Sequence, residues 1–260
     1  METLEQIPTP ALVLDLDRLE SNLDRMAERA DALGVALRPH VKTHKCLEVA
    51  RLQAERGARG LTVSTLEEAR IFADAGHRDL TWAFPVIPGR VDEAARLARR
   101  VRLGLVVDGR EALRALEATG EELRVWLKVD CGYGRAGLDP DGEALVELAS
   151  AASASPSLLF EGLLTHSGQG YAARGPDALA AVAEEERSVM TAAAARLEDR
   201  GLDVPAVSVG STPAVSRARA LDGVDEVRPG NYALYDFTQV HLGSCDLTDC
   251  AATVLATVVS

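Results

Sequence analysis

Short apolar runs alternate with amphipathic stretches along most of the chain. The run Ala11–Leu14 predicts a strand, and the pattern of Leu16–Leu33 predicts a helix that ends at Gly34. Eight later runs also predict strands: Ala36–Val41, Gly60–Val63, Leu80–Phe84, Arg102–Val107, Leu123–Asp130, Leu158–Thr165, Ala206–Val209 and Asp225–Arg228. Helical patterns separate most of them: Cys46–Arg56, Leu66–Ala75, Val91–Arg100, Arg110–Ala118, Gly142–Ala152 and Asp177–Arg200.

This order of elements predicts an α/β fold. Strands that alternate with helices pair in parallel, and eight of them favour a closed (β/α)8 TIM barrel. An open sheet of six or seven strands is the alternative. The last apolar run, Ala251–Val259, has no later strand as a partner. We therefore expect it to pair with Ala11–Leu14 or to lead into a longer protein.

In a barrel, the two faces of the predicted strand Leu123–Asp130 would have different surroundings. Its odd-numbered residues are apolar and should pack on the outer helices, because successive side chains of a strand point to opposite faces. Its even-numbered residues should point into the lumen: Arg124, Trp126, Lys128 and Asp130. A lysine and an aspartate inside a barrel need partners or a function.

Charge and composition exclude several classes of protein. The net charge is −12, from 28 basic and 40 acidic residues. Nucleic-acid binding needs a basic face, so we expect no nucleic-acid partner. No apolar run is long enough to cross a bilayer and no signal peptide is visible, which predicts a cytoplasmic protein without a membrane partner. The four cysteines form no CxxC pair and are expected to be free thiols rather than a zinc site.

The distribution of lysine is the first sign of chemistry. The chain has three lysines, and two of them, Lys42 and Lys45, lie in the stretch Arg38–Lys45; the third is Lys128. Arginine cannot form a Schiff base, whereas a lysine with a lowered pKa can act as the nucleophile. The alternative is that a chain poor in lysine has two close together by chance.

Several candidate functional residues follow the predicted strands. The active site of a (β/α)8 barrel lies at the carboxyl ends of its strands, so these side chains should meet on one rim. The candidates are Lys42, Arg135, His166, Tyr171, Gly210, Ser211, Thr212, Gly230, Asn231 and Tyr232. Structural roles remain open for some of them, such as a hydrogen-bonded His166 or an Arg135 paired with a neighbouring acid.

The turn Gly210-Ser211-Thr212 suits a phosphate group. It offers backbone N–H groups and two hydroxyls where a short helix should begin. An ordinary helix cap, with Pro213 at the first helical position, is the alternative. A lysine that forms a Schiff base and a phosphate turn on the same barrel are what pyridoxal 5'-phosphate (PLP) needs.

Five motifs together resemble one family. They are Thr9–Asp15, Arg38–Lys45, Val129–Gly137, Gly210–Pro213 and Arg228–Tyr232. They are similar to motifs of the D-serine dehydratase and D-threonine aldolase family, which comprises fold-type III PLP enzymes related to the alanine racemase N-terminal domain. The segment Arg38–Lys45 resembles the cofactor-lysine motif and is the most specific of the five.

The resemblance implies a role for each candidate. Lys42, and not Lys45, would form the Schiff base, with His166 and Arg135 lining the cofactor and sharing in catalysis. Tyr171 would approach the pyridine nitrogen. Gln169 stands where family members usually have a histidine, so a proton relay at this position does not follow from the resemblance. The phosphate would lie in the last two motifs, at Gly210, Ser211, Thr212, Gly230, Asn231 and Tyr232.

The resemblance also implies a domain division and a metal. Residues 17–240 would form the PLP-binding barrel, and strands within 1–16 and 241–260 would belong to a C-terminal β-domain that is truncated here. In family members that domain carries a His/Cys or His/Asp pair for a divalent metal, zinc or manganese. His241 and Cys245 lie too early to be that pair, so no metal ligand is assigned in this chain.

The implied function is a PLP-dependent lyase that acts on a D-β-hydroxy amino acid, as a homodimer. The Val129–Gly137 motif favours a D-serine dehydratase type, which eliminates water to give a keto acid and ammonia. A D-threonine aldolase type, which gives glycine and an aldehyde, is the first alternative. A non-catalytic PLP carrier and an amino-acid racemase are the others.

Overall fold

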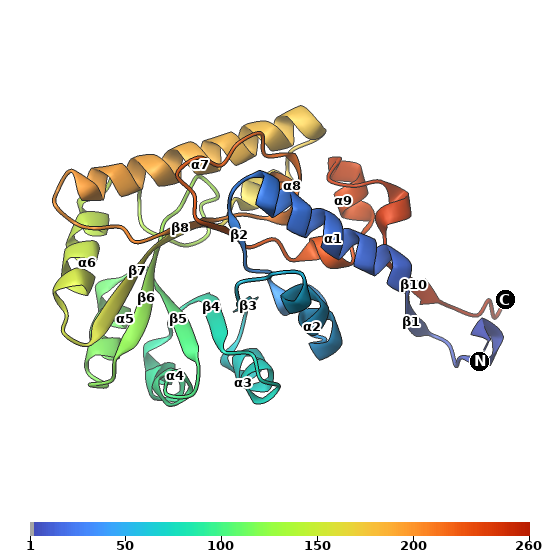
Figure 1. Cartoon of the computed structure of the whole chain (residues 1–260), viewed down its shortest axis with the longest axis horizontal. Helices are drawn as coiled ribbons and strands as arrows, with labels where there is room; N and C mark the ends of the chain where they lie inside the picture. The colour runs from blue at the N-terminus through green and yellow to red at the C-terminus, as the bar shows by residue number, and fades with distance from the viewer. Residues whose placement is uncertain (1–2) are drawn as a thin grey trace.

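The computed structural model describes residues 3–260 and is built around one parallel sheet (Figure 1). Its eight strands are ordered β2-β9-β8-β7-β6-β5-β4-β3. The ends of the sheet approach each other, since Thr62 N donates to Pro39 O at 2.8 Å and His40 bridges to Thr62. The predicted eight-stranded barrel-like α/β fold is confirmed. The strands are β2 (Ala36–Leu37), β3 (Leu61–Val63), β4 (Asp79–Pro85), β5 (Arg102–Val107), β6 (Leu123–Lys128), β7 (Leu158–Leu164), β8 (Val207–Val209) and β9 (Glu226–Val227).

Helices follow the strands and cover the outside of the sheet (Figure 1). They are α1 (Leu16–Ala32), α2 (Leu47–Glu55), α3 (Leu66–Asp74), α4 (Val91–Ala98), α5 (Arg110–Glu117), α6 (Glu143–Ala154), α7 (Pro176–Glu198), α8 (Thr212–Arg217) and α9 (Phe237–Leu242). Helix α9 is absent from the elements that the sequence pattern predicts. The Asp236 side chain caps its first turn by accepting from Gln239 N, and Gly243 ends it with φ +87°. An N-cap aspartate and a C-terminal glycine are the signals that mark such a short helix.

The first barrel strand is shorter than predicted. The expected strand Ala36–Val41 is regular only over Ala36–Leu37, and Val41–Thr43 forms a 3-10 turn, η2. Pro39 has no N–H to donate to a neighbouring strand, so the ladder weakens there. The chain still follows the barrel wall, because His40 N donates to Pro229 O at 2.9 Å.

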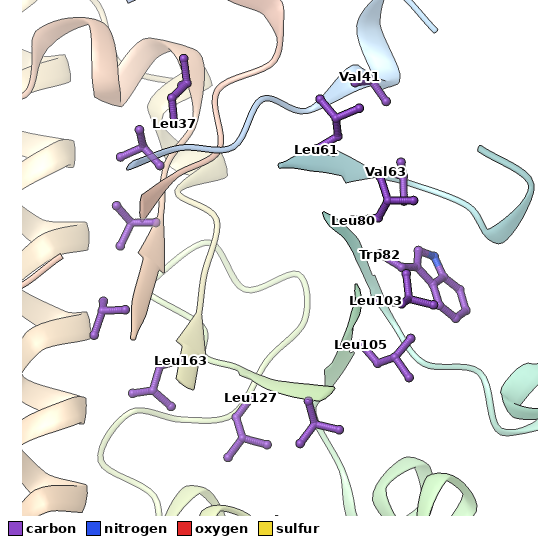
Figure 2. Close-up of a cluster of buried hydrophobic side chains, with 14 of the residues drawn as sticks. Leu37, Val41, Leu61, Val63, Leu80, Trp82, Leu103, Leu105, Leu127 and Leu163 are labelled. Atoms are coloured by element: carbon purple, nitrogen blue, oxygen red, sulfur yellow. The ribbon is translucent and has the colours of Figure 1, made fainter. Parts of the chain in front are cut away.

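The hydrophobic core lies between the barrel and its helices. Figure 2 shows buried side chains of β2 to β7 that point away from the ring of strands. Leu123, Val125 and Leu127 of β6 are each at most 1% exposed, which confirms the predicted outer face of this strand. Burial of each such side chain contributes about 1.5–3 kcal/mol.

The lumen of the barrel is filled in layers. Near the amino ends of the strands, Arg38 pairs with Asp79 and with Glu226, at 2.6 and 2.8 Å. Above this charged layer, Val106, Trp126 and Leu164 form a small apolar cluster. Lys128 comes next along β6 and reaches the upper, carboxyl end of the lumen.

A second, two-stranded sheet lies beside α1 (Figure 1). Strand β1 (Ala11–Leu14) pairs antiparallel with β10 (Ala252–Leu255), with Leu12 opposite Val254. The expected pairing of the last apolar run with Ala11–Leu14 is thus observed. Within residues 3–260, none of the helices combines the length and the apolar character needed to cross a bilayer.

Candidate active site

A cavity of about 410 Å³ opens at the carboxyl ends of the barrel strands. Its volume is within the range of small-molecule sites, roughly 300–1,000 Å³. Nine of the ten predicted site residues line it, although they come from five separate segments of the chain. These nine are Lys42, Arg135, His166, Tyr171, Gly210, Ser211, Thr212, Gly230 and Asn231.

Lys42 lies in the turn η2, immediately after the first barrel strand. The turn is held in place by Thr43, whose hydroxyl donates to Gly230 O at 2.9 Å. Burial lowers the pKa of Lys42, and the positive charges of Arg135 and Arg228 lower it further. A larger fraction of the amine is therefore neutral and nucleophilic than in a lysine that is fully surrounded by water.

Positive charge dominates the cavity wall. Four cationic side chains line it, Lys42, Lys128, Arg135 and Arg228, and the lining contains no aspartate or glutamate. Lys128 is only 4% exposed, and its ammonium group has no hydrogen-bond or ion-pair partner within residues 3–260. Burial lowers its pKa to about 8, with Arg228 and Arg135 adding to the effect. Such a site favours an anionic ligand, because the ligand's charge would compensate the buried cations.

Arg228 was not assigned a role from the sequence, although it begins the Arg228–Tyr232 motif. Its guanidinium donates to Ser208 Oγ at 2.9 Å and also to Thr165 O. Ser208 in turn donates to Glu226, the partner of Arg38. Burial lowers the pKa of Arg228 to about 10. The lumen network thus extends from the charged layer to the floor of the cavity.

His166 and Arg135 both lie beside the ring of Tyr133. The His166 ring packs edge-on to the Tyr133 ring, with the centroids 6.1 Å apart, and its Nδ1 lies 3.3 Å from Gly210 O. Burial and the charge of Lys42 lower the pKa of His166 to about 3, so the imidazole is neutral at physiological pH. Arg135 forms no ion pair within the described part of the chain, and its guanidinium lies 5.3 Å from the Tyr133 centroid.

The turn Gly210–Thr212 caps a helix and also offers N–H groups to a phosphate, the two roles considered from the sequence. Ser211 caps α8 by accepting from Ala214 N at 3.4 Å, and Thr212 Oγ1 accepts from the N–H of Gly230 at 3.1 Å. Gly210 N donates to the buried carboxylate of Glu186. The backbone N–H groups of Ser211, Thr212 and Asn231 have no acceptor among residues 3–260. These three groups are available to an anion such as phosphate.

Two aromatic residues that were predicted together occupy different places. Tyr171 lines the cavity, and burial raises its pKa. Tyr232 does not line it: its side chain is 1% exposed and its hydroxyl accepts from Gln53 Nε2 at 3.0 Å. Only the backbone of Tyr232 contacts the predicted phosphate turn, through its N–H, which donates to Thr212 Oγ1 at 3.2 Å. Gln169 donates to Cys131 O at 3.0 Å, outside the cavity lining.

The chain is also similar in sequence to a known protein family. The family model described as "Alanine racemase, N-terminal domain" matches residues 14–236. The chain belongs to this family. The alanine racemase N-terminal domain family has the fold-type III architecture of PLP-dependent enzymes, so the resemblance inferred from the five motifs is confirmed.

Characterised relatives in the alanine racemase N-terminal domain family include lyases. D-threo-3-hydroxyaspartate dehydratase of Delftia sp. (strain HT23) is 43% identical and covers 99% of this chain, which spans 69% of that enzyme. Its solved structure superimposes with a TM-score of 0.95 over 98% of this chain and 68% of the enzyme. D-serine dehydratase of Dictyostelium discoideum is 36% identical over all of this chain and 71% of its own length. The structure of D-threonine aldolase from Filomicrobium marinum gives a TM-score of 0.87 at 32% identity, over 95% of this chain and 69% of that enzyme.

The residues of this cavity fit the cofactor of the alanine racemase N-terminal domain family. PLP needs an amine for its aldehyde and hydrogen-bond donors for its phosphate. Lys42 provides the amine, and the free N–H groups of Ser211, Thr212 and Asn231 provide the donors. The cationic wall suits the negative charges of the cofactor and of an amino-acid carboxylate.

Proposed function

We propose that this protein is a PLP-dependent lyase that acts on D-β-hydroxy amino acids. One observation carries the proposal: Lys42, whose pKa is lowered by partial desolvation and by neighbouring arginines, shares a single cavity with backbone N–H groups that have no acceptor among residues 3–260. The lyase chemistry is supported by relatives named D-threo-3-hydroxyaspartate dehydratase, D-serine dehydratase and D-threonine aldolase.

The residues would divide the work by position. Lys42 would hold the cofactor covalently and, once displaced by the substrate amine, would present a neutral amine to the Cα proton. Arg135 and Lys128 would orient the substrate carboxylate through charge. His166, which is neutral, could accept or share a hydrogen bond but would carry no positive charge. When bound, PLP supplies an electron sink for the negative charge that develops at Cα.

We favour a dehydratase over an aldolase. The support is the higher identity with the Delftia dehydratase, 43%, than with the aldolase of known structure, 32%. In a dehydratase the β-hydroxyl leaves after the Cα proton, giving a keto acid and ammonia. In an aldolase the Cα–Cβ bond breaks and glycine is released.

We also propose that a divalent metal ion, zinc or manganese, assists the departure of the β-hydroxyl in the dehydratase reaction. A mutant of the Delftia dehydratase has been solved in a metal-free form. Within residues 3–260, no three His, Cys, Asp or Glu side chains are grouped to hold a metal ion.

The proposal is tested by product analysis. Purified protein with PLP is incubated with D-serine, D-threo-3-hydroxyaspartate or D-threonine, with and without zinc or manganese. We expect keto acid and ammonia from a D-β-hydroxy substrate, and no product from the Lys42→Ala variant. Glycine release instead would favour the aldolase. Tight PLP binding without turnover of any substrate would contradict the lyase and favour a cofactor carrier.

A further inference from the structure

Glu186 lies outside the cavity lining and yet contacts two of its loops. It is on α7, which packs against β8 and α8 (Figure 1). Its Oε1 accepts from Ser167 N at 2.9 Å and from Gly210 N at 3.1 Å. Ser167 follows β7 and is next to His166, whereas Gly210 follows β8 and is next to Ser211. One carboxylate oxygen therefore joins the two loops.

The environment of this carboxylate is unusual. Glu186 is 1% exposed and forms no ion pair within the described part of the chain. A buried carboxyl group without a paired cation is costly unless hydrogen bonds compensate for the loss of water. Burial raises the pKa of Glu186, and the hydrogen bond from Gly210 opposes that change. The N–H groups of Ser167 and Gly210 provide hydrogen bonds that compensate in part for the burial of the Glu186 carboxyl group.

The orientation of Gly210 is decisive for the phosphate end of the cavity. Gly210 has φ +116°, a conformation that L side chains rarely adopt, and a Cβ here would lie 3.0 Å from Arg228 N. With its own N–H directed to Glu186, the next two peptide groups present the N–H groups of Ser211 and Thr212 without protein acceptors. The Ser167 and Ser211 hydroxyls, 3.3 Å apart, couple the two loops at a second point.

We propose that Glu186 is a positioning residue that aims the N–H groups of Ser211 and Thr212 at the cofactor phosphate, through its hydrogen bonds to Ser167 and Gly210. This inference rests on the proposed function, since it assumes that PLP is the ligand. Glu186 acts through an acceptor oxygen, and its negative charge is not needed. Glutamine keeps that oxygen and removes the charge, whereas alanine removes both.

The test compares the affinity of the apo-protein for PLP and for pyridoxal, which lacks the phosphate, by spectroscopic titration without substrate. In Glu186→Ala we expect PLP affinity to fall about ten-fold or more, because the N–H groups of Ser167 and Gly210 lose their acceptor. Pyridoxal affinity should change by less than about two-fold, since no phosphate contact is involved. Glu186→Gln should retain the wild-type preference for PLP. Glu184→Ala, on the exposed face of the same helix, is the matched control.

If Glu186→Ala does not fold, Glu186→Asp replaces it, because the shorter side chain cannot reach both N–H groups. Equal losses for PLP and pyridoxal, or a Glu186→Gln variant as impaired as Glu186→Ala, would overturn the positioning role while leaving the proposed function intact. A wild-type protein that binds neither compound would overturn the proposed function, and this inference with it.

Discussion

The ammonium group of Lys45 lies 2.9 Å from Glu68 Oε1. This ion pair joins a largely exposed lysine to a buried carboxylate. The other oxygen of Glu68 accepts from Ser64 N at 2.7 Å, and Ser64 lines the cavity beside Lys42. The charge of Glu68 raises the Lys42 pKa, in opposition to burial and the arginines. Lys45 therefore compensates an acid that favours the protonated form of Lys42.

Replacement of Lys45 by methionine should raise the pKa of Lys42. Without its ion-pair partner, Glu68 would stabilise the protonated form of Lys42 more strongly. The pH midpoint for covalent capture of PLP by the apo-protein should move upward. Lys45→Arg keeps the charge and should stay near the wild type. An unchanged midpoint in Lys45→Met would show that Glu68 is not coupled to Lys42.

Lys128→Met should make the apo-protein more stable at neutral pH. Burial lowers the pKa of Lys128 from 10.5 to about 8. The unfolded state therefore binds this proton more tightly than the folded state does, and below pH 8 the charge of Lys128 destabilises the fold. Removal of that cation should add about 2–3 kcal/mol to the free energy of unfolding, measured with urea at pH 7. The same variant should bind PLP or substrate more weakly. A loss of stability would mean that Lys128 has a protein partner in solution.

His166 should make the protein sensitive to acid. Its pKa is lowered from 6.5 to about 3, so between these values the unfolded state binds more protons and the free energy of unfolding decreases as pH falls. The slope from this group is up to about 1.4 kcal/mol per pH unit. His166→Gln should lose less stability than the wild type between pH 6.5 and pH 5. Identical pH profiles for the two apo-proteins would contradict the buried, neutral state of this histidine.

Glu226→Gln should destabilise the fold through the lumen network. Glu226 is 2% exposed and pairs with Arg38, which is equally buried, so the variant leaves a buried guanidinium without one of its compensating charges. We expect a loss of about 3 kcal/mol in the free energy of unfolding by urea denaturation. Glu55→Gln, which removes the exposed pair with Arg51, should change it by less than about 1 kcal/mol. Equal effects would show that the lumen pair is no stronger than a surface one.

Much of the fold was predictable because its strands are buried on one side by helices. Apolar alternation in Leu123–Lys128 and the run Arg102–Val107 mark strands whose outer faces lie in the core. The bounds of β2 and β9 were less predictable. Pro39 and Pro229 lie beyond these strands and cannot donate to a neighbouring strand, so regular pairing stops early.

The candidate site was predictable where chemistry coincides with the end of a strand. Lys42 and His166 follow strands and carry side chains with few purely structural uses there. Lys128 was predicted to point into the lumen and Arg228 to end a strand, and neither was given a role, since the sequence does not show whether a buried charge has a partner. Glu186 was missed because it follows Glu184 and Glu185 in a helix, and only packing distinguishes the buried one of the three.

We propose Lys42 as the residue that binds PLP covalently. Purified protein is saturated with PLP, reduced with borohydride and digested, and the modified peptide is sequenced by mass spectrometry. We expect the stable cofactor label on Lys42, with no label on Lys45 or Lys128, and its loss in Lys42→Ala. Label on Lys45 or Lys128 in the wild type, or a protein that acquires no label at saturating PLP, would contradict the account.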